Sequence, residues 1–83
     1  MTAINNTTMS LEEIQGKHKE KYQRSYVSCH EPYERHYLID MIRECFPHAK
    51  KNDIEEVINI ACKMLPTPRN SDVFLKFVVE NLK

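Results

Sequence analysis

The sequence predicts an all-α fold, a small helical bundle with a three-helix core and a weaker N-terminal helix. Apolar residues recur at helical spacing in three segments, about 32–46, 53–65 and 71–82, and a proline follows each of the first two. The chain has 83 residues and a single glycine, which leaves little material for tight hairpins. We therefore expect one helical domain over residues 10–83, behind a polar, disordered tail at residues 1–9.

The N-terminal helix is predicted over about residues 11–24. Ser10 and Glu13 match a capping box, in which each side chain accepts a hydrogen bond from the backbone N–H of the other residue. The apolar stripe that includes Ile14 is thin. Gly16 lies in mid-helix, where glycine is roughly 1 kcal/mol less favourable than alanine. We expect this helix to dock loosely on the core and to fray.

The segment 32–46 has the clearest helical pattern of the chain. Pro32 suits the first helical position because the first N–H group has no intrahelical partner, and Pro47 stops the helix. The residues of its apolar face are Tyr33, Tyr37, Leu38, Met41, Ile42, Cys45 and Phe46.

The two C-terminal helices have start and stop signals of their own. Asn52 is the expected N-cap of the first, Asp53 adds negative charge to its first turn, and Pro66 ends it. Asn70 or Ser71 is expected to cap the last helix. The run FLKFVV in that helix also suits a strand, but no other segment offers it a partner strand, so a helix is predicted.

The three cysteines, Cys29, Cys45 and Cys62, are an odd number without the dense pairing of a secreted disulfide scaffold. Cys45 and Cys62 fall on predicted apolar faces, where a thiol behaves as a small hydrophobic group. The N-terminus lacks the basic start and apolar run of a signal peptide, and no stretch approaches the ~18 apolar residues of a membrane span. We expect a soluble protein in the cytoplasm.

Four side chains, Cys29, His30, Cys45 and His48, are candidate metal ligands by residue type. Structural zinc needs a tetrahedral set of thiolate or imidazole groups. Cys45 points to the predicted core, so the connector that carries Cys29 would have to fold back beside the helix end. We expect packing and loop roles, with no metal and no cofactor, and the sequence leaves open whether the four ever bind metal.

Catalysis is not expected. Cys29 and His30 are adjacent in sequence, an arrangement that rarely places the imidazole against the sulfur. No carboxylate pair lies in a predicted apolar pocket, and the charges of Glu55 and Glu56 are explained by the helix dipole. The sequence therefore predicts no catalytic residue and a protein that is not an enzyme.

Nucleic-acid binding is the alternative function. Lys17, Lys19, Lys21 and Arg24 of the N-terminal helix, with tyrosines interleaved, are candidate phosphate contacts of an accessory factor. Lys plus Arg equals Asp plus Glu at 12 each, so no overall charge draws the chain to nucleic acid or to an anionic membrane.

The main functional expectation is a small cytosolic protein–protein interaction module, a regulator, adaptor or inhibitor. Each main helix has an apolar arc of roughly 200–240°, wider than the ~100° that a surface helix of a small monomer needs. The edge residues Ile39, Ile60, Leu75 and Val79 are expected to be only partly covered by the three-helix core. Leu75 and Val79 should contact the N-terminal helix, a second copy of the chain or a partner protein.

Overall fold

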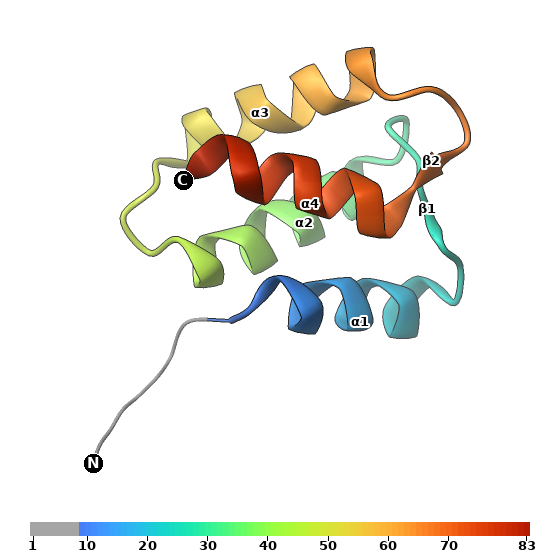
Figure 1. The fold of residues 1–83 in the computed structure, drawn as a ribbon, viewed down its shortest axis with the longest axis horizontal. Coiled ribbons are helices and arrows are strands. Elements are labelled where there is room, and N and C mark those ends of the chain that lie inside the picture. Colours follow the sequence, from blue (N-terminus) through green and yellow to red (C-terminus); the bar gives the residue numbers. More distant parts are fainter. Residues whose placement is uncertain (1–8) are drawn as a thin grey trace.

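The computed structural model describes residues 9–83, which form four helices and one pair of two-residue strands (Figure 1). The elements are α1 (Leu11–Tyr22), β1 (Tyr26–Val27), α2 (Pro32–Cys45), α3 (Lys51–Met64), β2 (Arg69–Asn70) and α4 (Ser71–Leu82). β1 and β2 pair antiparallel, with Tyr26 opposite Asn70 and Val27 opposite Arg69. The predicted all-α helical bundle is confirmed, and the strand pair is a small addition to it.

The helices enclose one apolar core. α3 and α4 run antiparallel beside each other, and α1 packs against both α2 and α4 (Figure 1). The fully buried large apolar side chains are Ile14, Leu38, Ile42, Ile54, Ile58, Phe74, Leu75 and Val78. Every helix contributes at least one of them, so the core depends on all four helices. Among the described residues no helix has the length and apolar character to cross a membrane.

α2 follows its predicted course closely. It begins at Pro32 as predicted and ends at Cys45, one residue early. Phe46 already has non-helical backbone angles (φ −132°, ψ 76°), because a residue that precedes proline is disfavoured in the helical region. Pro47 therefore ends the helix at Cys45, and Phe46, the residue directly before the proline, is already outside it.

α3 and α4 begin in different ways. α3 begins at Lys51, so the expected cap Asn52 lies inside the first turn, and no side chain caps this helix. α4 begins after Asn70, whose side-chain oxygen accepts a hydrogen bond from the N–H group of Val73 at 3.1 Å. This cap fixes the point where β2 ends and α4 begins. The run FLKFVV is helical, as predicted.

α1 begins as predicted and ends early. The N–H group of Ser10 donates to Glu13 Oε1 at 3.0 Å, and the N–H group of Glu13 donates to Ser10 Oγ at 3.2 Å. These two bonds are the predicted capping box. The helix ends at Tyr22, two residues before its predicted end, where Gln23 turns the chain with a left-handed φ of 52°.

α1 is built into the bundle more fully than its thin apolar stripe indicates. Ile14 and His18 are fully buried. The Gln15 side chain donates to the backbone oxygen of Asp72 at 2.9 Å, and Lys19 pairs with the Asp72 carboxylate at 2.7 Å. Both contacts join α1 to the first turn of α4, so α1 covers the face of α4 that includes Asp72.

Three of the four apolar edge residues are buried, and α1, one of the three contacts expected for Leu75 and Val79, packs against their helix. Leu75 and Val79 follow Asp72 by three and seven residues, so they share the face of α4 that α1 covers. The exposed fraction is 0% for Leu75, 6% for Val79 and 4% for Ile39, which makes them core residues and not an accessible interaction surface. Ile60, at 41%, keeps an accessible side chain.

Shortening Val79 tests this packing. Val79→Ala removes two buried carbon atoms at about 0.8 kcal/mol each, so the free energy of unfolding should fall by about 1.6 kcal/mol. Amide hydrogen exchange in α1 should become faster. The control Val73→Ala changes a side chain on the exposed side of the same helix and should alter stability by less than about 0.5 kcal/mol. Equal losses in the two variants would contradict the packing of α1 on Val79.

The predicted disordered tail at residues 1–9 lies outside the described residues except for Met9. Met9 is half-buried and its side chain packs against the core. Its N–H group donates to the backbone oxygen of Glu44 at 3.4 Å. The chain is therefore joined to the end of α2 just before α1 begins.

Candidate functional site

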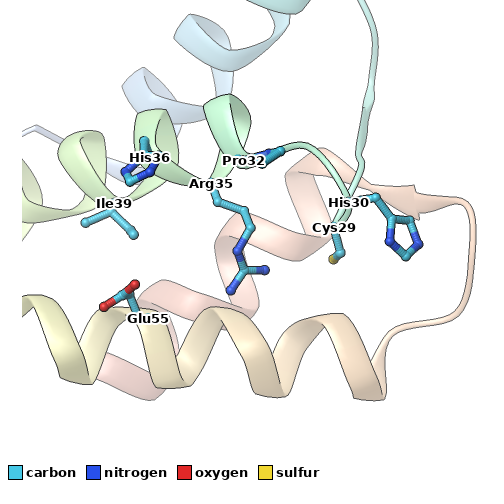
Figure 2. Close-up of a pocket in the computed structure, with 7 residues that line it drawn as sticks. All are labelled: Cys29, His30, Pro32, Arg35, His36, Ile39 and Glu55. Atoms are coloured by element: carbon cyan, nitrogen blue, oxygen red, sulfur yellow. The ribbon is translucent and has the colours of Figure 1, made fainter.

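A surface hollow of about 260 Å³ lies between α2 and α3, at the connector that precedes α2 (Figure 2). The side chains that line it include Cys29, Arg35, His36, Ile39 and Glu55. A second hollow of about 240 Å³ shares Cys29 and the adjacent histidine and extends to the loop before β2. The two hollows therefore share Cys29 and His30 in their linings.

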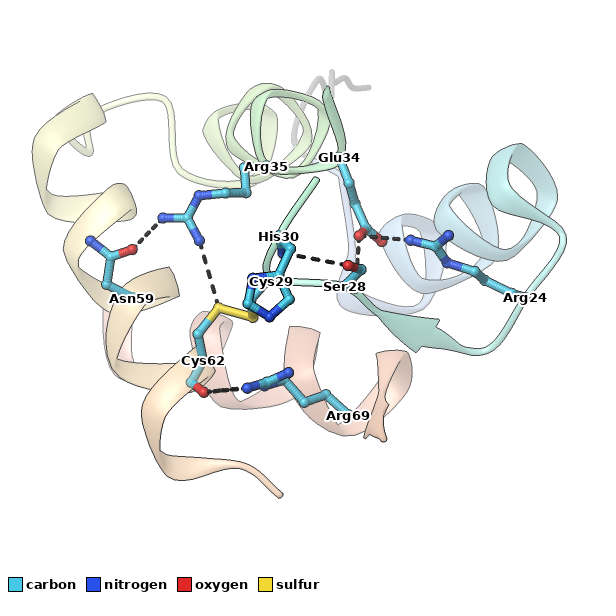
Figure 3. Close-up of a disulfide and its surroundings, with 9 residues drawn as sticks. All are labelled: Arg24, Ser28, Cys29, His30, Glu34, Arg35, Asn59, Cys62 and Arg69. Carbon is cyan, nitrogen blue, oxygen red and sulfur yellow. Dashed lines mark hydrogen bonds and ion pairs between the residues drawn. A yellow bond between two sulfur atoms is a disulfide. The ribbon is translucent and has the colours of Figure 1, made fainter. Parts of the chain in front are cut away.

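A disulfide joins Cys29 to Cys62 of α3, across 33 residues of chain (Figure 3). The two Cα atoms are 6.1 Å apart. The expectation that Cys62 acts as a small unpaired hydrophobic group is therefore wrong, and among the described residues Cys45 is the free cysteine. The sequence holds no signal for this pair, because it is the packing of the connector against α3 that brings the two residues within bonding range.

Two arginines bracket the disulfide (Figure 3). Arg35 Nη1 lies 3.6 Å from Cys62 Sγ. Arg35 Nη2 donates to Oδ1 of Asn59, which lies on α3 with Cys62. Arg69 donates to the backbone oxygen of Cys62 from Nη2 at 2.8 Å and from Nε at 3.2 Å. That oxygen belongs to the last turn of α3, where carbonyl groups lack helical partners. The two guanidinium groups thus fix the end of the helix that carries the sulfur.

The cysteine and histidine side chains considered as metal ligands do not gather at one place. Cys29 is bonded to Cys62, and His30 lines the hollow beside that bond. Cys45 and His48 line a different hollow at the end of α2. Burial raises the pKa of the Cys45 thiol, which disfavours the thiolate that a metal requires. Within residues 9–83 no three cysteine, histidine or acidic side chains are grouped closely enough to hold a metal ion.

A buried carboxylate joins α1, the connector and α2. Glu34 and His18 have no exposed side-chain surface, and His18 Nε2 donates to Glu34 Oε2 at 2.6 Å. Glu34 Oε1 accepts hydrogen bonds from Arg24 Nη2 and from the N–H group of Ser28, both at 2.8 Å (Figure 3). Burial alone would raise the pKa of Glu34, but the three hydrogen bonds and the Arg24 charge together lower it. The network is inaccessible to a ligand and serves the fold.

The basic residues of α1 and the following turn do not form one free patch. Arg24 donates to two carboxylates at the start of α2, and Lys19 pairs with a carboxylate of α4. Lys21 Nζ lies 5.1 Å from the centre of the Tyr37 ring, and Lys17 is exposed. Two of the four positive charges are therefore matched by acidic groups, which weakens the field that a phosphate backbone would meet.

Apolar side chains are exposed on α3 and α4, two helices that pack against each other. Ile60 and Met64, one turn apart on α3, are 41% and 67% exposed, and Val73 of α4 is 54% exposed. The half-buried Val57 and Phe77 lie on the same sides of these helices. The two helices run antiparallel and lie nearest each other at the start of α3 and the end of α4, and they separate toward the end of α3 and the start of α4 (Figure 1). These five side chains are called the α3–α4 strip below.

Over residues 9–83, fold and surface together define a small all-α domain of four helices with an internal disulfide, a buried charge network and an exposed apolar strip. No protein-family model, no curated protein and no solved structure matches this chain significantly. Its function must therefore be inferred from its own side chains.

Proposed function

We propose that this protein is a small interaction module, a regulator, adaptor or inhibitor, that binds another protein through the α3–α4 strip. The observation that carries the proposal is the exposure of Ile60, Met64 and Val73 on two helices that pack together. Single exposed apolar side chains are ordinary at a protein surface, and larger apolar patches are typical of interaction sites. The proposal takes these side chains of two neighbouring helices as parts of one such patch.

The surroundings of the strip suit a protein partner. Exposed charged residues flank it on both helices, namely Glu56 and Lys63 on α3 and Lys76 and Glu80 on α4. An apolar centre with a polar rim is the usual arrangement of a protein–protein interface. The apolar face of an amphipathic helix, laid along the line between α3 and α4, is a partner surface of this kind.

Nucleic-acid binding through α1 is the less supported alternative. Lys19 and Arg24 already pair with carboxylates, and the chain has a formal net charge of zero. Affinity for nucleic acid depends largely on unmatched positive charge. We propose no catalytic role, since His18 and Glu34, an acid–base pair in direct contact, are fully buried.

We propose that the protein is located in the cytoplasm, where its disulfide would be exposed to cellular thiols. Cytosolic thiol pools keep most cysteines reduced, and disulfides persist mainly in oxidising compartments. A cytoplasmic protein with the Cys29–Cys62 bond would therefore exchange this bond with cellular thiols.

Replacing Ile60 and Met64 together by lysine should remove partner binding and leave the fold intact. Both side chains are exposed, so the circular dichroism spectrum and the Tm should stay close to those of the unchanged protein. A photo-crosslinking residue at position 64, introduced in the native host, identifies the partner by mass spectrometry. The affinity of the purified partner for the double variant should be at least about tenfold weaker, a loss of ~1.4 kcal/mol or more.

Tyr33→Lys is the matched control for the double variant. Tyr33 is 87% exposed on α2, and its replacement also puts a lysine in place of a large exposed side chain, outside the strip. The control should bind the partner with unchanged affinity. Sedimentation equilibrium shows whether the partner is a second copy of the chain, because Ile60→Lys with Met64→Lys would then convert a dimer to a monomer. Equal affinities of the unchanged protein and the double variant would refute the proposal.

A further inference from the structure

We propose that Cys29 is a modification site, at which a small thiol forms a mixed disulfide while Cys62 leaves as a thiolate. The proposal is independent of partner binding at the α3–α4 strip. Two observations carry it. Cys29 lines both hollows beside the disulfide, whereas Cys62 lines neither of them. The sulfur of Cys62 lies against the guanidinium group of Arg35.

Access distinguishes the two sulfur atoms. Thiol–disulfide exchange requires a thiolate to reach one sulfur of the bond, and its rate depends on which sulfur is open to attack. The hollow of about 260 Å³ leads to Cys29 between α2 and α3 (Figure 2). Because Cys29 also lines a second hollow beside the loop before β2, a small molecule can approach this residue from two sides. Cys62 lines neither hollow.

The positive charge of Arg35 distinguishes Cys62 as the leaving group. Arg35 Nη1 lies 3.6 Å from Cys62 Sγ, and its guanidinium group carries a positive charge. Arg35 Nη2 donates to the neutral side chain of Asn59. Among residues 9–83, Arg35 forms no ion pair with an acidic side chain. Glu55 lines the same hollow without pairing with Arg35. An unmatched positive charge stabilises a thiolate on Cys62, and a stabilised thiolate leaves faster.

The reaction balances with a small thiol as the co-reactant. The thiol, RSH, loses its proton to solvent and attacks as RS⁻. A bond forms between its sulfur and Cys29 Sγ, the Cys29–Cys62 bond breaks, and the electron pair stays on Cys62 Sγ beside Arg35. A second RS⁻ attacks the R sulfur of the mixed disulfide, which releases RSSR and the Cys29 thiolate. The two protein thiolates then take up two protons, so the protein gains two electrons and two RSH are oxidised to RSSR.

The opened form should remain folded. The connector stays attached through the pairing of β1 with β2 and through the hydrogen bond from the Ser28 N–H group to Glu34 at 2.8 Å. Cys29 and Cys62 are half-buried and pack against the edge of the core, and neither is one of its fully buried residues. The mixed disulfide can therefore form on the native protein and does not require unfolding.

Peptide mapping of the adduct tests the direction of opening. Trypsin would place the three cysteines in separate peptides, residues 25–35, 44–50 and 52–63. The oxidised full-length protein is treated briefly with reduced glutathione and quenched with acid, and free thiols are blocked with N-ethylmaleimide before digestion. We expect glutathione on 25–35 and the blocking group on 52–63, in roughly tenfold excess over the reverse arrangement. An even or reversed distribution would overturn the proposal.

Substitution of Arg35 gives a second and independent readout. Arg35→Gln removes the positive charge beside Cys62 and should slow formation of the adduct by roughly tenfold, while Arg35→Lys should keep most of the rate. If Arg35 only held the structure together, Arg35→Gln would loosen the site and speed the reaction. A faster reaction, or equal rates for Arg35→Gln and Arg35→Lys, would show that the guanidinium charge does not assist the departure of Cys62.

Discussion

Replacing Cys29 and Cys62 together by serine should lower the free energy of unfolding by about 3–4 kcal/mol. The disulfide closes a loop across 33 residues, and the entropy that this loop removes from the unfolded chain corresponds to about 3.7 kcal/mol at 25 °C. In a domain of this size each kcal/mol shifts the Tm by about 4–8 °C, so the Tm should fall by about 15–30 °C. Thermal unfolding followed by circular dichroism measures the change.

Cys45→Ser is the matched control for the loss of the disulfide. Cys45 is half-buried and free, so its replacement should cost about 1 kcal/mol or less. A reductant should lower the Tm of the unchanged protein and of Cys45→Ser, and should leave the double variant unaffected. If the reductant left the Tm of the unchanged protein where it was, the bond would contribute nothing to stability.

The helices could be predicted because their signals are local. Pro32, the capping pair of Ser10 with Glu13, and Asn70 each act within one turn of their own position. Apolar recurrence at helical spacing then identified the segments between these signals. The start of α3 at Lys51 was missed for the same reason: Asn52 resembles a cap, but no side chain caps this helix.

Contacts between distant segments could not be predicted from the sequence. The wide apolar arc of α4 showed how much surface needed covering, and it did not show that α1 would cover Leu75 and Val79. The pairing of Cys29 with Cys62 and of β1 with β2 depends on the same packing. Each of these features follows from the arrangement of the helices in space, which the spacing of residues along the chain does not reveal.

The buried charge network has a partial signal in the sequence. His18 follows Ile14 by four residues and Glu34 precedes Leu38 by four, so each is a polar side chain on an apolar helical face. Buried polar groups require hydrogen-bond partners, and an acid and a histidine on two such faces can satisfy each other. The pattern suggests a buried pair, although only the fold shows that the two faces meet.

Glu34→Gln should lower the free energy of unfolding by about 3 kcal/mol or more, the usual cost of removing one partner from a buried ion pair. The Glu34 carboxylate accepts hydrogen bonds from His18, Arg24 and the Ser28 N–H group, and an ionised carboxylate only accepts. A glutamine amide has one accepting oxygen and a donating NH₂ group, so that group would face one of these donors in a fully buried site. His18 could accept from it only by carrying its proton on Nδ1, which is buried without a hydrogen-bond partner. Urea unfolding at neutral pH measures the loss.

The pH dependence of stability and the control Glu31→Gln separate this burial effect from an ordinary ion pair. Folding lowers the pKa of Glu34 from its ordinary value of 4.5, so its contribution is present above that value and is lost as the pH falls below it. Below pH 4.5 the unchanged protein should therefore lose stability more steeply than Glu34→Gln. Glu31 also binds Arg24, but its side chain is 47% exposed, so Glu31→Gln should cost about 1 kcal/mol or less. Equal losses in both variants, with equal slopes in acid, would mean that Glu34 contributes no more than a surface carboxylate.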